Sequence, residues 1–166
     1  MTRHRMTIQM AGAAVAAWAL GSQSVDRAAA QSITPPAAQS QNHDGSDAPQ
    51  VFAEAVWSVN NPSIATGATA QLSSGPFVNA SRSSLKSDCQ LSLRIVSSSG
   101  MAGWTAIAPL DQTSFGGGDE TAVVVANSTK KGNGQLGLTV TFINSDYSIL
   151  GAGQYLATVT GTIVAN

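Results

Sequence analysis

At 166 residues the chain has room for one domain, and only 10% of its residues are charged, against ~25% in an average globular protein. Residues 31–166 carry eight acidic and five basic side chains, a net charge of −3, which argues against a nucleic-acid partner. A single cysteine, Cys89, excludes an intramolecular disulfide, and we expect it to be a small buried residue rather than an intermolecular bridge.

The N-terminus has the three parts of a bacterial signal peptide. Basic residues lie at 3–5, an apolar run follows at 10–20, and a small-residue triplet stands at 28–30. The run is about half of the ~20 residues that a stable membrane span requires. We therefore expect a leader over residues 1–30, no membrane span, and an exported product in the periplasm, on the cell surface or outside the cell. Cleavage is expected after Ala30, or else after Ala29 or Gly21.

The next segment, residues 31–50, is rich in Pro, Gln, Ser and Asp and has almost no large apolar residue. Such a composition is typical of a flexible, disordered linker. The folded domain is accordingly expected over residues 51–166.

In the first part of this domain, apolar and polar residues alternate with the two-residue period of a β-strand. Residues 51–59 are expected to form a strand that ends at Asn60-Asn61-Pro62, and residues 64–72 a weaker one. The Ser-rich stretch 77–86 shows no clear period and is expected to be a loop. On the first strand, one face would carry Val51, Ala53, Ala55, Trp57 and Val59.

Strand and turn signals continue to the end of the chain. Strands are expected at 90–97, 103–108 and 121–126, with a loop at 111–120 that contains three successive glycines. Asn133-Gly134 predicts a tight hairpin turn, because both residues tolerate positive φ. Two further strands are expected at 135–143, returning from that turn, and at 153–166, where Tyr155, Ala157, Val159, Gly161 and Ile163 would share one face.

The whole pattern predicts an all-β fold. No window shows a sustained helical stripe, and about seven strand-and-turn units are present, which is typical of an antiparallel sandwich or barrel. We favour an immunoglobulin-like β-sandwich, since bulky residues suit a thin core between two sheets; a barrel is the alternative. These core residues are Trp57, Trp104, Phe142 and Tyr155.

A search for catalytic chemistry finds no candidate. Beyond the leader the only histidine is His43, in the expected linker, where it could not be held beside a nucleophile or complete a zinc site with Cys89. Ser83–Lys86 matches the S-x-x-K spacing without its companion motifs. Gly116–Gly118 is followed by Asp119-Glu120, whose negative charges would repel a phosphate. These two acids and Asp111 do not have the spacing of a calcium-binding EF-hand loop. We expect no catalytic residues, metal site or cofactor.

The C-terminal third contains a sequence pattern that is similar to a known family of domains. Gly153 and Tyr155, followed by alternating Thr158, Thr160 and Thr162, resemble the last strand of bacterial exported domains of the spore-coat-U and fimbrial-subunit type. The resemblance implies an immunoglobulin-like fold and a role in surface assembly, in which subunits lend strands to each other. The candidate donor is the arm at residues 48–59; pairing of this arm within its own domain is the alternative, and the favoured one.

Two functions follow as expectations. The first is a secreted, non-enzymatic structural or adhesive surface protein, whose partners would be copies of itself or other surface subunits joined by strand pairing. The second is an extracellular module that binds carbohydrate or another ligand by aromatic stacking. The candidate stacking residues are Trp57, Trp104 and Tyr147.

Overall fold

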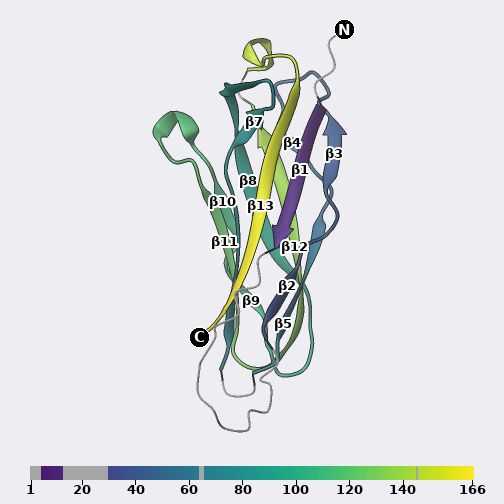
Figure 1. The fold of residues 1–166 in the computed structure, drawn as a ribbon, viewed down its shortest axis with the longest axis vertical. Coiled ribbons are helices and arrows are strands. Elements are labelled where there is room, and N and C mark those ends of the chain that lie inside the picture. The colour runs from purple at the N-terminus through teal and green to yellow at the C-terminus, as the bar shows by residue number, and fades with distance from the viewer. Residues whose placement is uncertain (1–4, 13–29, 64–65, 145) are drawn as a thin grey trace, which may run out of the picture.

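The predicted all-β architecture is confirmed by a computed structural model, which describes residues 5–12, 30–63, 66–144 and 146–166 (Figure 1). Within these residues the regular elements are strands and two short 3-10 helices. The strands are β1 (Arg5–Gly12), β2 (Ser32–Thr34), β3 (Gln39–Asn42), β4 (Gln50–Val51), β5 (Ala55–Asn61), β6 (Ala68–Ser74), β7 (Phe77–Asn79), β8 (Arg82–Ser98), β9 (Thr105–Ala108), β10 (Leu110–Gln112), β11 (Ala122–Ser128), β12 (Gly132–Ile143) and β13 (Gln154–Ala165), and the 3-10 helices are η1 (Phe115–Gly117) and η2 (Tyr147–Ile149).

The strands form two layers that are joined through β8. Sheet A has the order β3-β1-β13-β6-β11-β9, and sheet B has the order β2-β5-β12-β8-β10, with β4 also paired to β12. The short strand β7 pairs with both β13 and β8, so the start of the 17-residue β8 belongs to sheet A and the remainder to sheet B. Among the described strands every pairing is antiparallel except that of β1 with β13, which is parallel.

The core lies between the two layers and takes the inward side chains of each strand. An aromatic cluster occupies one part of it: the ring centroids of Phe77 and Phe142 are 5.0 Å apart, and those of Phe142 and Tyr155 are 5.6 Å apart, both edge-to-face. Such pairs stabilise a core by about 0.5–1.5 kcal/mol beyond the area that they bury. Trp57 and Trp104 are buried in the core as well.

The two most regular patterns in the sequence are confirmed. In β13 the expected face is buried, including Tyr155, Val159 and Ile163, while Thr158 and Val164 face outward. In β8 the side chains of Leu91 and Leu93 are buried, as the alternation over residues 90–97 predicts.

The predicted strand 51–59 is interrupted, and its first half has the wrong phase. The segment forms β4 and β5, separated by residues 52–54. Phe52 is buried and its N–H donates to the carbonyl of Val140, whereas Val51 is 58% exposed. The irregular step between the two strands shifts the alternation by one residue, and a shift of one residue exchanges the two faces of a strand.

The predicted hairpin turn at Asn133-Gly134 is wrong. Both residues lie inside β12, and the bend before this strand falls at 129–131. β11 and β12 do not pair, because β11 belongs to sheet A and β12 to sheet B. Gly134 serves packing instead of a turn: a Cβ atom there would lie 2.6 Å from Cδ1 of Trp104.

Three segments expected to be irregular contain strands. Residues 31–50, predicted as a disordered linker, hold β2, β3 and the start of β4. The predicted loop 77–86 contains β7 and the start of β8, where the outward side chains are mostly polar and no apolar period arises. The predicted loop 111–120 overlaps β10 and η1. Together with β1, these short strands account for the thirteen strands of the described residues, where about seven were predicted.

Candidate functional site

The most distinctive feature of the sandwich is the place that β1 takes in sheet A. This strand pairs with β13 over its full length, from Arg5 opposite Gln154 to Gly12 opposite Gly161. On its other edge it pairs with β3, from Arg5 opposite Asn42 to Ile8 opposite Gln39. Figure 1 shows β1 in purple between the yellow β13 and the blue β3. We call the space that residues 5–12 fill between these two strands the β1 slot.

The β1 slot accepts large apolar side chains at alternating positions. Met6 and Ile8 are fully buried in the core, and Met10 is partly buried against it. Thr7 and Gln9 point the other way; the Thr7 hydroxyl oxygen accepts a hydrogen bond of 2.8 Å from the side-chain amide of Gln154. Burying a side chain the size of Ile8 or Met6 stabilises a fold by about 1.5–3 kcal/mol.

The expected leader overlaps this strand. Residues 5–12 belong to the segment predicted to be removed, while residues 1–4 and 13–29 of that segment lie outside the described residues. The alternation of Met6, Ile8 and Met10 is the available signal for a strand here, and it coincides with the composition of a leader. Removal of residues 1–30 stays a prediction, and it would leave the edge of β13 from Gln154 to Gly161 without its parallel partner.

The two tryptophans proposed for ligand stacking lie inside the protein. Trp57 is fully buried in β5, packed so closely on Gly161 that a Cβ atom there would lie 2.6 Å from Trp57 Cζ3. Trp104 is 4% exposed and packs behind Gly134. Neither ring offers a face to a ligand in solution, so the stacking hypothesis loses both residues.

Tyr147, the third proposed stacking residue, holds the segment that contains β3. Its ring stacks on His43, with centroids 4.9 Å apart and planes 26° from parallel. The backbone N–H of Tyr147 donates a 2.6 Å hydrogen bond to Oδ1 of Asp47. Tyr147 belongs to η2, at the opposite end of the sandwich from β9, which Trp104 immediately precedes (Figure 1). The three residues therefore do not form one binding surface.

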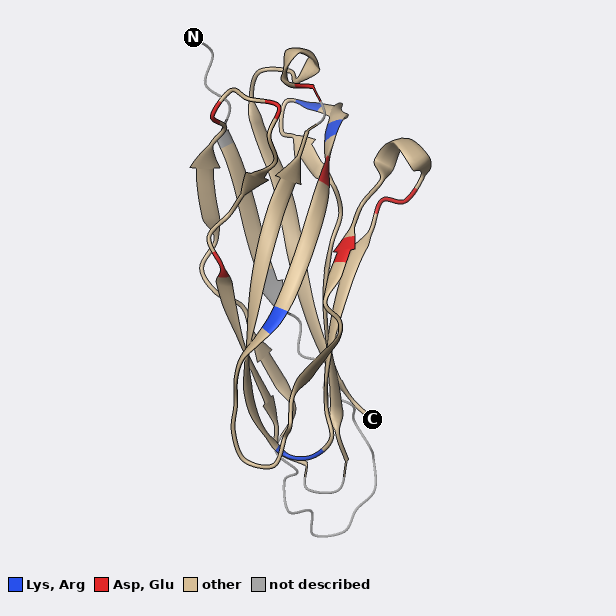
Figure 2. Cartoon of the chain, turned by 180° about the vertical axis from the view of Figure 1, so that it is seen from behind, with Lys and Arg blue, Asp and Glu red and all other residues tan. Residues whose placement is uncertain are grey.

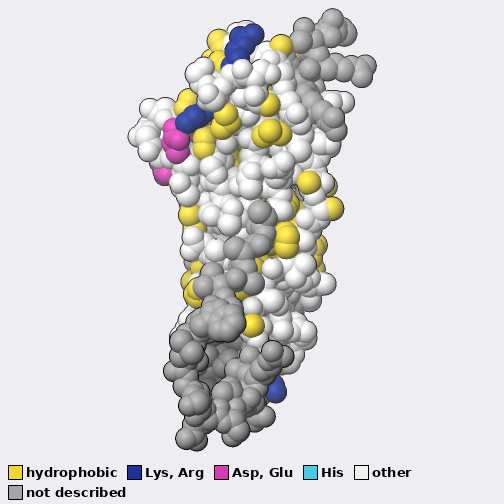
Figure 3. All heavy atoms as spheres, in the orientation of Figure 1, with side chains coloured by type: hydrophobic (Ala, Val, Ile, Leu, Met, Phe, Trp, Pro, Cys, Tyr) yellow, Lys and Arg dark blue, Asp and Glu magenta, His cyan; other side chains and the backbone are white. Residues whose placement is uncertain are grey.

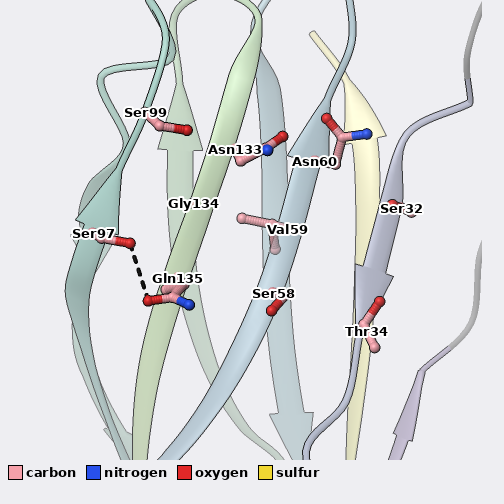
Figure 4. Close-up of a pocket in the computed structure, with 10 residues that line it drawn as sticks. All are labelled: Ser32, Thr34, Ser58, Val59, Asn60, Ser97, Ser99, Asn133, Gly134 and Gln135. Atoms are coloured by element: carbon pink, nitrogen blue, oxygen red, sulfur yellow. Dashed lines mark hydrogen bonds between the residues drawn. The ribbon is translucent and has the colours of Figure 1, made fainter.

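A second candidate site is a polar hollow of about 420 Å³ on the outer face of sheet B (Figure 4). Its residues come from β2, β5, β8 and β12 and from Ser99, which follows β8. Thr34, Ser58 and Gln135 are cross-strand neighbours, and the Ser97 hydroxyl donates to Gln135 at 3.1 Å. The hollow has hydrogen-bonding groups but no charged or aromatic side chain among its lining residues. These are Ser32, Thr34, Ser58, Val59, Asn60, Ser97, Ser99, Asn133, Gly134 and Gln135.

Of the acidic side chains considered for a cation, Asp111 joins β10 to β11, Asp119 accepts from the N–H of Thr121 and Glu120 pairs with Lys86. A further acid, Asp88, holds the neighbouring loop. Oδ1 of Asp88 accepts hydrogen bonds from Thr113 Oγ1 at 2.7 Å and from the N–H of Phe115 at 2.9 Å. Oδ2 of Asp111 accepts from the N–H of Val123 at 2.7 Å. Over the described residues, no group of three or more His, Cys, Asp or Glu side chains is placed to hold a metal ion.

The S-x-x-K spacing lies on a strand. Ser83 and Lys86 both belong to β8 and not to a helix turn, and Lys86 pairs with Glu120 at 2.6 Å. Charged groups are sparse on the strands and gather mainly in the loops (Figure 2). The face that carries β1 and β13 is mostly uncharged where it is described (Figure 3).

Comparison with known proteins does not add a family. Neither a protein-family model nor a curated protein sequence matches the chain. In the described part of the chain, no helix has the length and apolar character that crossing a membrane demands.

Proposed function

We propose that this chain is an exported, non-enzymatic structural or adhesive surface protein, a subunit of a pilus-like or coat-like assembly built on an immunoglobulin-like sandwich. The observation that carries the proposal is the β1 slot. Sheet A is completed by a strand from the very segment that has signal-peptide character. Once that segment is removed, the processed domain needs another strand to complete its sheet.

The physical case rests on what removal of β1 would expose. The edge of β13 would present unpaired N–H and C=O groups, which are a template for pairing with another chain. The core positions that the side chains of Met6 and Ile8 occupy would become accessible to water at the same place. Proteins that add a strand at such an edge gain affinity from main-chain hydrogen bonds and specificity from the alternate side chains. Strand addition is therefore the assembly mode that we propose.

The non-enzymatic part of the proposal is supported by where the reactive side chains lie. Asp88 and Asp111 accept hydrogen bonds from backbone N–H groups, Lys86 pairs with Glu120, and the side chain of His43 is 1% exposed. Burial raises the pKa of the Cys89 thiol to about 12, so that it is not a nucleophile near neutral pH.

The experiment is expression of the full chain with a C-terminal tag in an exporting bacterial host. We expect the tagged protein in the exported fraction, with an N-terminus at Gln31 and in complexes held together without a disulfide. Recovery of an unprocessed monomer from the cytoplasm would contradict the proposal.

The second candidate function is a binding module for a neutral carbohydrate, and the polar hollow is the observation that favours it. Hydroxyl and amide groups in this hollow can both donate to and accept from sugar hydroxyls. Titration of neutral oligosaccharides, followed by amide NMR shifts of Asn60 and Asn133, tests this candidate. Shifts confined to the hollow would support it, and their abolition in Asn60→Ala would locate the site.

A further inference from the structure

We propose that a second hollow, at the end of the sandwich where η2 lies, binds a neutral peptide-like ligand that presents a branched aliphatic group and a carbonyl oxygen. The hollow has a volume of about 250 Å³, and β8, η1 and η2 all contribute to its lining. We call it the η2 hollow. The inference goes beyond the proposed function and does not depend on the removal of residues 1–30. The apolar walls of the hollow are Leu85, Phe115, Ile143, Ile149, Leu150 and Tyr155.

The η2 hollow is built by segments that are far apart in the sequence. The two coiled ribbons of Figure 1 are η1, on the hairpin between β10 and β11, and η2, at the tip of the molecule. The N–H of Phe115 donates to Oδ1 of Asp88 at 2.9 Å, which fixes η1 beside β8. The Ser87 hydroxyl donates to the carbonyl of Ile143 at 2.5 Å, which joins β8 to the end of β12. The walls are therefore held in place without a ligand, and this lowers the ordering cost of binding.

Large apolar side chains at the rim of the η2 hollow are left in contact with water. Ile149 is 71% exposed and Phe115 is 38% exposed, while Leu85 and Leu150 are partly buried against the core. A ligand that covers these side chains gains the free energy of apolar burial. The volume is below the roughly 300–1,000 Å³ of pockets for drug-sized ligands, so it suits one branched aliphatic group.

One wall of the η2 hollow carries a hydrogen-bond donor that lacks an acceptor. Asn144 is 9% exposed, and its Nδ2 is buried and has no hydrogen-bond partner among the described residues. Its Oδ1 accepts from the N–H of Asp146 at 3.4 Å. A buried donor is costly to leave unpaired, and most such groups in proteins have a partner. Because Asn144 lines the hollow, a carbonyl oxygen on the ligand can supply the missing acceptor.

The charged side chains at the η2 hollow favour a ligand without a negative charge. Nζ of Lys86 pairs with Oε1 of Glu120 at 2.6 Å, so the charge of this lysine is already compensated. Within the described part of the chain, Asp88 accepts hydrogen bonds but forms no ion pair, so one negative charge stays beside the hollow. A carboxylate on the ligand would be repelled by this charge. A peptide segment with a branched aliphatic residue combines the apolar group, the carbonyl and the absence of charge.

The test uses the full chain, labelled with nitrogen-15, and small probes of defined chemistry. N-acetyl-L-leucine methylamide has the aliphatic group, the carbonyls and no charge, so we expect it to bind and to shift the side-chain amide signals of Asn144. The glycine analogue lacks the aliphatic group and should bind about tenfold more weakly. N-acetyl-L-leucine, an anion, should also bind more weakly, and this deficit should shrink at high salt. Equal binding by the three probes, or no binding by the first, would overturn the proposal.

The position of the site is tested with a matched pair of surface variants. Ile149→Ser changes the rim of the η2 hollow, whereas Ile107→Ser changes a side chain that is 60% exposed on β9, at the opposite end of the sandwich (Figure 1). We expect Ile149→Ser to weaken binding of the leucine methylamide probe about threefold or more, and Ile107→Ser to leave it unchanged. An equal loss in both variants would show non-specific apolar binding and contradict the assignment.

The donor role of Asn144 is tested in the parent protein, so that it does not depend on the folding of a variant. The neutral leucine probe should slow the exchange of the side-chain amide protons of Asn144 with water. Unchanged exchange in the presence of bound probe would place the donor elsewhere and overturn the assignment. The cationic leucine methylamide, which lacks the acetyl group, should bind more weakly than the neutral probe. Tighter binding of this cation would make Asp88 the recognition group and contradict the inference.

Discussion

Ile8 lies opposite Ala157 in the parallel ladder of β1 and β13, and both side chains are buried in the core. Replacing Ile8 by Ala in the unprocessed chain should lower the free energy of unfolding by about 2–5 kcal/mol, because it removes core contacts and leaves a cavity. Urea unfolding measures the change. Gln9→Ala, on the exposed face of the same strand, is the control and should stay within about 0.5 kcal/mol of the parent. Equal stability of the two variants would place β1 outside the cooperative core.

Gly134 is expected to be intolerant of even a methyl group. A Cβ atom at this position would lie 2.6 Å from Trp104 Cδ1, so Gly134→Ala forces the ring or the strand to move. Overpacking of this kind costs about 1–3 kcal/mol. Tryptophan fluorescence and thermal unfolding should both change. Gly116→Ala is the matched control, since a Cβ atom there would meet nothing within 4 Å, and it should leave both signals unaltered.

The Glu54–Arg94 ion pair predicts a contribution to stability that disappears in acid. The guanidinium Nε and Nη2 of Arg94 donate to the carboxylate of Glu54, and this bonding holds the pKa of Glu54 below its ordinary value of 4.5. A group whose pKa is lower in the folded state stabilises the fold above its unfolded-state pKa, and the contribution is lost as pH falls through the folded-state pKa.

The measurement is the melting temperature of the parent and of Glu54→Gln from neutral pH down to pH values below the folded-state pKa of Glu54. The variant should melt lower near neutral pH, and the two curves should converge in acid. Both partners are partly exposed, so the difference should be small and should shrink at high salt. An offset that is the same at every pH would show that the ion pair is not its cause.

Cys89 should react with thiol reagents only through unfolding. Its side chain is fully buried, and burial raises its pKa to about 12, so almost no thiolate forms near pH 8. A chromogenic disulfide reagent should react quickly in denaturant and slowly with the native protein. Fast reaction of the native protein would contradict the buried position.

The regular strands can be predicted from sequence because burial there follows the period of the backbone. In β13, Tyr155 and Val159 are buried and Thr158 between them is exposed, so pattern and structure agree. The predicted alternation is wrong at Phe52, because the irregular residues between β4 and β5 exchange the inward and outward faces of the strand. A period of two contains no signal for such a step.

Contacts between distant segments are beyond the reach of local patterns. Gly134 resembles a turn residue because it follows Asn133. In the structure a side chain is excluded at Gly134 because the ring of Trp104, which is distant in the sequence, packs against it. The stacking role proposed for Trp57 depends on exposure, which only the packing of β5 against Gly161 decides. The strand character of Met6, Ile8 and Met10 is present in the sequence and is masked by the leader composition around it.

The most direct test of the β1 slot is hydrogen exchange over residues 155–161 in the processed protein recovered from exporting cells, with and without a synthetic peptide that has the sequence of Arg5–Gly12. We predict that the amides of β13 that face the slot exchange quickly alone and become protected when the peptide is bound, while those paired with β6 stay protected throughout. Full protection along this edge in the isolated processed monomer, unchanged by the peptide, would contradict an open slot.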